Sequence, residues 1–87
     1  MYVILVYDVS VERVNKVLAI GRKYLTWIQN SVLEGEISRG NLTRLEDEIK
    51  QVVDEEHDSI TFYILRTTRY LEKRTIGRVK GEIAKIL

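Results

Sequence analysis

Six consecutive apolar residues, Tyr2 to Tyr7, come directly before an aspartate, Asp8. The run is rich in β-branched and aromatic residues and shows no polar alternation, which is typical of a strand at the centre of a sheet. It is far too short to span a bilayer and is unlike a signal peptide. We therefore expect a soluble, cytoplasmic domain built around a central strand, with no membrane partner.

Two later segments repeat apolar residues at helical spacing. The first follows Ser10, a favourable N-cap, and has Glu12 in its first turn. Its apolar stripe consists of Val14, Val17, Leu18, Gly21 and Leu25. The second follows Ser38 or Asn41, and its stripe consists of Leu42, Leu45, Ile49 and Val52 or Val53. We therefore expect two amphipathic helices.

The segments around these helices have the character of strands and loops. Residues 26–37 favour extended structure, as one strand or as two, and Asn30-Ser31 is the only candidate break. Residues 54–58 form a charged segment that we expect to be a solvated loop. Residues 59–65 alternate between two faces and predict a strand.

The expected order of elements is β-α-β(β)-α-β followed by a tail that begins near residue 67. This order matches the split βαβ, ferredoxin-like plan of the α+β class, with two helices on one face of an antiparallel sheet. A chain of 87 residues is the length of one small domain, so we expect residues 1–87 to form a single unit. So small a domain has a thin core, and a dimer partner would add buried surface.

Composition excludes several kinds of site. The sequence has no cysteine and one histidine, His57, so disulfides, thiolate metal sites and histidine-rich zinc sites are excluded, and a Ser-His-Asp triad is implausible. His57 lies in the acidic segment, where a solvated loop residue is the simpler interpretation than a ligand or a base.

Charge is unevenly distributed along the chain. Residues 1–33 carry a net charge of +2, residues 34–58 carry −6, and residues 66–87 carry +5. The basic end could contact a polyanion, because Lys and Arg neutralise phosphates and release counterions. An ordinary solvated surface and pairing with the acidic second helix of a partner subunit are the alternatives.

Asp8 is the main candidate for chemistry. It ends the central strand beside Tyr7, although an aspartate there can also serve as a turn residue or compete with Ser10 as a helix cap. Mg²⁺ prefers oxygen ligands and usually takes one or two carboxylates together with water and substrate phosphate. No other acid has obvious access to Asp8 within one chain, whereas a two-fold dimer could supply a second Asp8.

Three strings carry a resemblance to a known family. They are Tyr7-Asp8-Val9-Ser10, Gln29-Asn30-Ser31-Val32-Leu33-Glu34-Gly35-Glu36 and Asp58-Ser59-Ile60-Thr61-Phe62-Tyr63. In their order, spacing and total length they resemble the CRISPR-associated protein two family, whose members accompany the CRISPR integrase in the acquisition of new spacers. The resemblance covers about residues 1–66.

The resemblance implies a ferredoxin-like homodimer with Mg²⁺ held between the two Asp8 carboxylates, which would make Asp8 both the catalytic and the metal-binding residue. It implies an endonuclease for single-stranded RNA or double-stranded DNA, and partnership with the integrase and with prespacer DNA. It also implies a further strand within residues 70–79 that packs on the partner subunit. With this family in view, Tyr7, Arg13, Arg66 and Arg69 are the candidate contacts to nucleic acid.

Two positions depart from the family pattern. Trp27 stands where many relatives have arginine, and Leu33 stands where phenylalanine is common. If that arginine supports phosphate binding or catalysis, cleavage by this chain would be weak. Trp27 would then serve in core or interface packing.

Three functions remain open at this point. The first is a metal-dependent endonuclease with paired Asp8 residues. The second is a non-catalytic, architectural dimer that bridges integrase subunits and holds prespacer DNA, with Asp8 structural. The third, from the fold alone, is a small regulatory ligand-binding domain.

Overall fold

The computed structural model describes residues 1–67 and 70–78. Within them the elements follow the order β1 (Tyr2–Asp8), α1 (Val11–Arg22), β2 (Thr26–Gln29), β3 (Val32–Glu36), α2 (Arg39–Lys50), β4 (Ser59–Thr67) and β5 (Tyr70–Gly77). This is the β-α-β-β-α-β order with one additional strand. The predicted α+β, ferredoxin-like fold is therefore confirmed.

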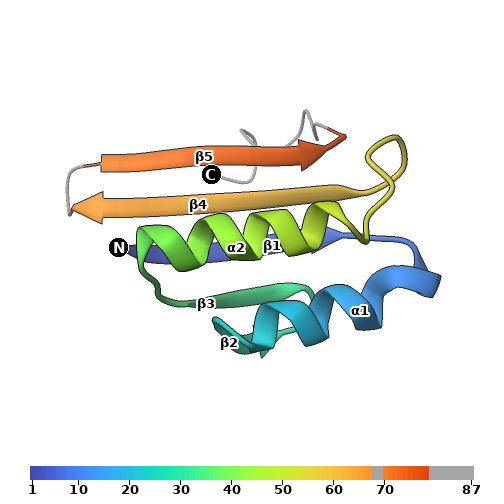
Figure 1. The fold of residues 1–87 in the computed structure, drawn as a ribbon, viewed down its shortest axis with the longest axis horizontal. Coiled ribbons are helices and arrows are strands. Elements are labelled where there is room, and N and C mark those ends of the chain that lie inside the picture. Colours follow the sequence, from blue (N-terminus) through green and yellow to red (C-terminus); the bar gives the residue numbers. More distant parts are fainter. Residues whose placement is uncertain (68–69, 79–87) are drawn as a thin grey trace.

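The described strands form one antiparallel sheet in the order β2-β3-β1-β4-β5, with β1 at its centre. Figure 1 shows α1 and α2 side by side on the same face of this sheet. We call the opposite face, which is turned away from α1 and α2, the outer face. The long β1, which is apolar from Tyr2 to Tyr7, has strand neighbours on both sides, as its sequence predicts.

Alternation along β1 divides its side chains between the two faces of the sheet. Val3, Leu5 and Tyr7 are buried against the helices. The intervening residues, among them Val6 and Asp8, therefore lie on the outer face. The catalytic candidate is thus on the side of the sheet that the helices do not cover.

The helices supply the other half of the core. Leu42, Leu45 and Ile49 of α2 are buried, and so is Val17 of α1, in agreement with the predicted stripes. Gly21 brings α1 close to β3, because a Cβ atom at this position would lie 3.0 Å from a methyl carbon of Leu33.

The extended segment of residues 26–37 forms two strands. The chain reverses at Asn30, which has a φ of 37°, so the candidate break at Asn30-Ser31 is confirmed. The β2–β3 pairing shifts register between Trp27 and Gln29, and the β4–β5 pairing shifts between Leu65 and Thr67. The two inner pairings, β1–β3 and β1–β4, are continuous.

Helix α2 begins after Ser38, whose side-chain oxygen accepts a hydrogen bond from the backbone N–H of Asn41 at 3.1 Å. This settles which of the two residues is the cap. Ser10 occupies the cap position of α1, but its side chain makes no capping hydrogen bond. Among the residues that the structure describes, no helix has the length and apolar character needed to cross a membrane.

The segment after β4 is extended, as the family resemblance implies, rather than helical. β5 pairs with β4 of the same chain from Thr67↔Tyr70 to Ser59↔Gly77. Val79, the last residue of the predicted segment, lies outside the described residues. Packing of the tail on a partner subunit, and the single-domain boundary at 1–87, stay predictions.

Candidate functional site

Asp8 is the last residue of β1 and is exposed. It pairs in register with Ser59, the first residue of β4. The two residues that follow, Val9 and Ser10, connect β1 to α1. The orientation of Asp8 therefore depends on how firmly this short connection is held.

The connection is held by a buried carboxylate, that of Asp58. Its Oδ1 atom accepts hydrogen bonds from the backbone N–H of Ser10 at 3.1 Å and from Arg13 Nη2 at 2.9 Å. Its Oδ2 atom accepts from Arg13 Nε at 2.6 Å and from the backbone N–H of Asp54 at 2.9 Å. One side chain thus joins the turn after Asp8 to the first turn of α1.

Asp58 has an exposed fraction of 0%, so the expectation of a solvated loop over residues 54–58 is wrong for this residue. The Arg13 guanidinium, supported by the backbone N–H groups of Asp54 and Ser10, holds the pKa of the Asp58 carboxyl far below its usual range. Asp58 therefore stays ionised at any pH at which the protein would work.

The backbone of Asp58 adds a third segment to this contact. Its carbonyl oxygen accepts a hydrogen bond from the N–H of Arg78 at 2.9 Å, directly after β5. Gly77 makes this approach possible, because a Cβ atom there would lie 2.1 Å from that oxygen, and its φ is +90°. We call this meeting of Ser10, Arg13, Asp58 and Gly77 the Asp58 junction.

Arg13 is occupied within the chain. Besides its two bonds to Asp58, its Nη1 atom donates to Glu12 at 3.2 Å. These acidic partners raise the pKa of its guanidinium, the hydrogen bonds to Asp58 most of all. Contact between Arg13 and nucleic acid stays a prediction. The hydrogen bonds to Asp58 give Arg13 a structural role as well.

Tyr7 belongs to the core, with an exposed fraction of 3%. Burial raises the pKa of its hydroxyl, which lies 3.5 Å from the carbonyl oxygen of Asn30. Contact between Tyr7 and nucleic acid stays a prediction, and this burial argues against it.

Arg66 lies near the far end of β4, and its guanidinium donates to Glu72 of β5 at 3.0 and 2.8 Å. Arg74 of β5 donates to Glu72 at 2.6 Å and to Glu46 of α2 at 3.2 Å. One basic residue of the tail therefore pairs with the acidic second helix, but within the same chain. Arg69 lies outside the described residues.

Only one group of three or more potential metal ligands occurs in the described part of the chain, and it does not include Asp8. It consists of Asp54, Glu56 and His57, in the loop before β4. His57 is exposed, as predicted, and its Nδ1 atom lies 2.9 Å from an Asp54 oxygen. At Asp8 a single chain supplies one exposed carboxylate, which matches a Mg²⁺ site completed by water, phosphate and a second copy.

Trp27 lies on the edge strand β2 and is 46% exposed, so it is not part of the core. Its Nε1 atom donates to the carbonyl oxygen of Asn30 at 2.9 Å, and the Arg22 guanidinium stands 5.8 Å from its ring centre. Of the two packing tasks expected for Trp27, only the interface remains.

Sequence patterns point to Asp8 but not to the residue that fixes its turn. The available signal for Asp58 is its place directly before β4, because antiparallel pairing of β4 with β1 brings it next to the turn after Asp8. Arg13, a candidate contact to nucleic acid, is brought together with Asp58 by the structure. Arg66, at the other end of the sheet, is not part of this site.

The chain resembles proteins whose names agree with one another. The family model "CRISPR associated protein Cas2" matches residues 1–73. A relative from Dictyoglomus turgidum is 54% identical over all 87 residues of both chains, and one from Thermotoga maritima is 50% identical over 82 residues, 94% of each chain. Both relatives are named CRISPR-associated endoribonuclease Cas2.

Solved structures agree with these relatives. One titled "Crystal structure of cas2" matches with a TM-score of 0.74 and 47% identity, over 93% of this chain and 91% of its own. The Cas2 of Streptococcus pyogenes matches with a TM-score of 0.69 and 32% identity, over 75% of this chain and 86% of its own. Sequence, fold and length thus point the same way, and the chain belongs to the CRISPR-associated Cas2 family.

Proposed function

We propose that this chain is a metal-dependent endonuclease that hydrolyses phosphodiester bonds in single-stranded RNA or double-stranded DNA, with Asp8 as its catalytic and metal-binding residue. The observation that carries the proposal is the placement of Asp8: exposed, at the end of the central strand, on the outer face, and followed by a turn that the Asp58 junction fixes. The endoribonuclease names of the relatives support it.

Two copies of the chain form the site in this proposal. The outer face of β1 presents Val6, which is 36% exposed, in the same row as Asp8. In this proposal the two-fold axis passes through the outer face close to Asp8, so the two Asp8 carboxylates approach each other while apolar side chains are buried. This homodimer would also supply the burial that a thin core lacks.

Within the site, the residues of the chain hold and orient. Asp8 supplies carboxylate oxygen, the ligand type that Mg²⁺ prefers. Asp58 and Arg13 hold the backbone at Ser10, in the turn that follows Asp8. The backbone that carries Asp8 is thus ordered before the substrate binds, so the reaction does not have to supply the entropy cost of ordering it. Bound Mg²⁺ would supply activation of water near neutral pH and stabilisation of charge on the phosphate.

A second function in the same family context is architectural. In this alternative the dimer takes part in spacer acquisition by bridging subunits of the CRISPR integrase and holding prespacer DNA, and it cuts nothing. Trp27 favours it, because this aromatic residue is exposed on an edge strand and is available to a partner.

Comparison of the wild type with Asp8→Asn distinguishes the two functions. Both proteins are incubated with labelled RNA and labelled duplex DNA, with Mg²⁺ or with a chelator, at dimer content matched by light scattering. Asp47→Asn, at an exposed site on α2, controls for the loss of one carboxylate. We expect cleavage by the wild type and the control, abolished by the chelator and by Asp8→Asn.

Equal activity of the wild type and Asp8→Asn would overturn the nuclease proposal. Absence of cleavage by either protein, with integrase binding retained, would favour the architectural function.

A further inference from the structure

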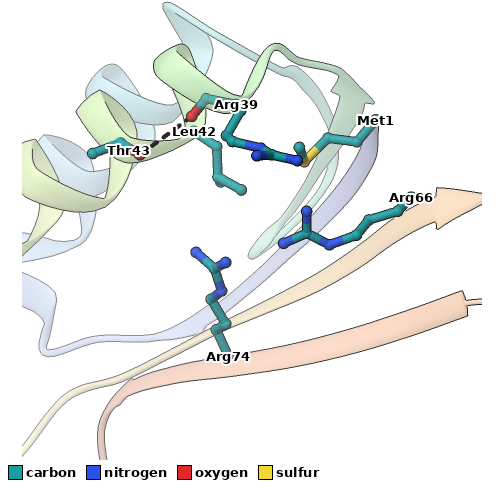
Figure 2. A pocket seen from close by; sticks show the side chains of 6 residues that line it. All are labelled: Met1, Arg39, Leu42, Thr43, Arg66 and Arg74. Atoms are coloured by element: carbon teal, nitrogen blue, oxygen red, sulfur yellow. Dashed lines mark hydrogen bonds between the residues drawn. The ribbon is translucent and has the colours of Figure 1, made fainter.

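A second candidate site lies at the other end of the sheet. A cavity of about 280 Å³ opens between the start of α2, the end of β4 and the middle of β5, with room for several waters or a phosphate group. Its lining consists of Met1, Arg39, Leu42, Thr43, Arg66 and Arg74. In Figure 2 the side chains of Arg66 and Arg74 extend from the strands toward the end of α2 that carries Arg39.

The three arginines carry more positive charge than their neighbours neutralise. Arg66 and Arg74 share Glu72, and Arg74 also contacts Glu46. Arg39 has no ion pair with any residue that the structure describes. Three guanidinium groups thus face two carboxylates, which leaves an excess of one positive charge at the cavity.

Two further features suit an anion with oxygen acceptors. Arg39 is the first residue of α2, so the positive end of the helix dipole lies at the cavity. Guanidinium groups bind phosphate oxygens with two parallel hydrogen bonds, which gives an arginine cluster a preference for phosphate over a simple halide. The Thr43 hydroxyl donates to the Arg39 carbonyl at 3.2 Å and so supports the backbone there.

This cavity is separate from Asp8. Met1 lines it just before β1, whereas Asp8 ends β1, and a strand of seven residues is roughly 20 Å long. The cavity also lies on the side of the sheet that carries α2, and Asp8 lies on the outer face. A dimer formed through the outer face would therefore leave two such cavities accessible.

We propose that the Arg39–Arg66–Arg74 cavity binds a phosphate group of a nucleic acid strand, as a second contact independent of the Asp8 site. The proposal goes beyond cleavage, because it holds equally for a nuclease and for an architectural dimer. It gives Arg66 a role in concert with Arg39 and Arg74.

Arg39→Gln is the informative variant, because within residues 1–67 and 70–78 Arg39 forms no ion pair whose loss would disturb the fold. Arg44→Gln is its control: Arg44 lies on the same helix, is exposed, and does not line the cavity. Binding of labelled oligonucleotides with and without a 5′-phosphate is measured by anisotropy over a series of salt concentrations. Binding of inorganic phosphate and pyrophosphate is measured by calorimetry.

We expect Arg39→Gln to weaken oligonucleotide binding about tenfold and to lower the salt dependence by about one phosphate contact. Arg44→Gln should leave this contact intact. A loss confined to the 5′-phosphorylated oligonucleotide would assign a terminal phosphate to the cavity, and an equal loss for both would assign a backbone phosphate.

The proposal would be overturned if Arg39→Gln and Arg44→Gln changed oligonucleotide binding equally. It would also be overturned if Arg39→Gln weakened the binding of pyrophosphate but left oligonucleotide binding unchanged. The ligand of the cavity would then be a free phosphate compound. Failure of Asp8→Asn to alter cleavage bears only on the nuclease and leaves this inference in place.

Discussion

The Asp58 carboxylate and the Arg13 guanidinium form a bidentate ion pair, with Nε–Oδ2 at 2.6 Å and Nη2–Oδ1 at 2.9 Å. Asp58 is fully buried, and the Arg13 side chain is 20% exposed. The pair lies beneath the turn that follows Asp8, so it links the stability of the fold to the geometry of the proposed active site.

Asp58→Asn should destabilise the protein by about 3–5 kcal/mol, because removing one partner of a buried pair leaves the other charge uncompensated. The free energy of unfolding is measured by urea denaturation and compared with that of Asp47→Asn. A loss below about 1 kcal/mol would show that the junction contributes little.

The free energy of unfolding should decrease in acid, and the lowered pKa of Asp58 is the reason. Its pKa is lowered in the folded state, whereas an unfolded aspartate has a pKa of about 3.9. The unfolded chain therefore binds more protons below about pH 4, and the stabilisation is complete above that value and lost as the pH falls through the folded pKa.

Between about pH 5 and about pH 3 the wild type should lose about 1 kcal/mol more than Asp58→Asn, which lacks this proton. Urea denaturation at several pH values measures both losses. Glu72 and Asp54 also have lowered pKa values, because of Arg74 and His57 respectively, so a residual acid sensitivity is expected in the variant. Parallel pH profiles for the two proteins would contradict the assignment to Asp58.

Much of this fold is predictable from the sequence because its signals are local. The apolar run of β1 and the stripes of α1 and α2 follow directly from periodicity. The Asn30-Ser31 break was visible as a candidate, but only pairing with β1 decides that β2 and β3 are separate strands. Extension of β5 was expected from the family resemblance.

Of the two acidic residues that define the site, the sequence predicts Asp8 but not Asp58, for a physical reason. Asp8 is marked by its place at the end of an apolar strand. Asp58 looks like one more acid in a charged segment, and its burial depends on Arg13, 45 positions away. Such a pair becomes visible only when β4 is placed beside β1.

Gly77→Ala should cost at least about 2 kcal/mol, because the new Cβ would collide with the Asp58 carbonyl oxygen and would occupy a backbone conformation with φ of +90°. Gly40→Ala is the matched control, since nothing lies within 4 Å of a Cβ atom in α2 at that position. It should be neutral or stabilise by up to about 1 kcal/mol. Thermal unfolding of the two variants compares them, and similar melting temperatures would contradict the close approach at Gly77.

Trp27→Ala should change the free energy of unfolding by less than about 1 kcal/mol, whereas Phe62→Ala should cost about 3–5 kcal/mol. Trp27 is 46% exposed and Phe62 is 0% exposed, so only Phe62 leaves a cavity. Urea denaturation followed by circular dichroism measures both without relying on the tryptophan signal. A cost for Trp27→Ala equal to that of Phe62→Ala would contradict this exposure and place Trp27 in the packed core.

Val6→Asp should convert the proposed dimer to monomers, because it puts a charge on the outer face that a second copy would bury. Val11→Asp is the control: Val11 is 84% exposed at the start of α1, where an acid is favourable. Light scattering gives the mass of each variant. A Val6→Asp protein that stays dimeric would move the interface away from the outer face.

The register shifts in the two outermost pairings have a consequence for behaviour at high concentration. An open sheet ends in strands whose unpaired backbone groups can recruit further chains, and irregular edges resist this. Here the pairing is continuous around β1 and is interrupted near Trp27 and Leu65. The chain thus keeps uninterrupted pairing at its centre, and the bulged β2 border is a poor template for fibril growth.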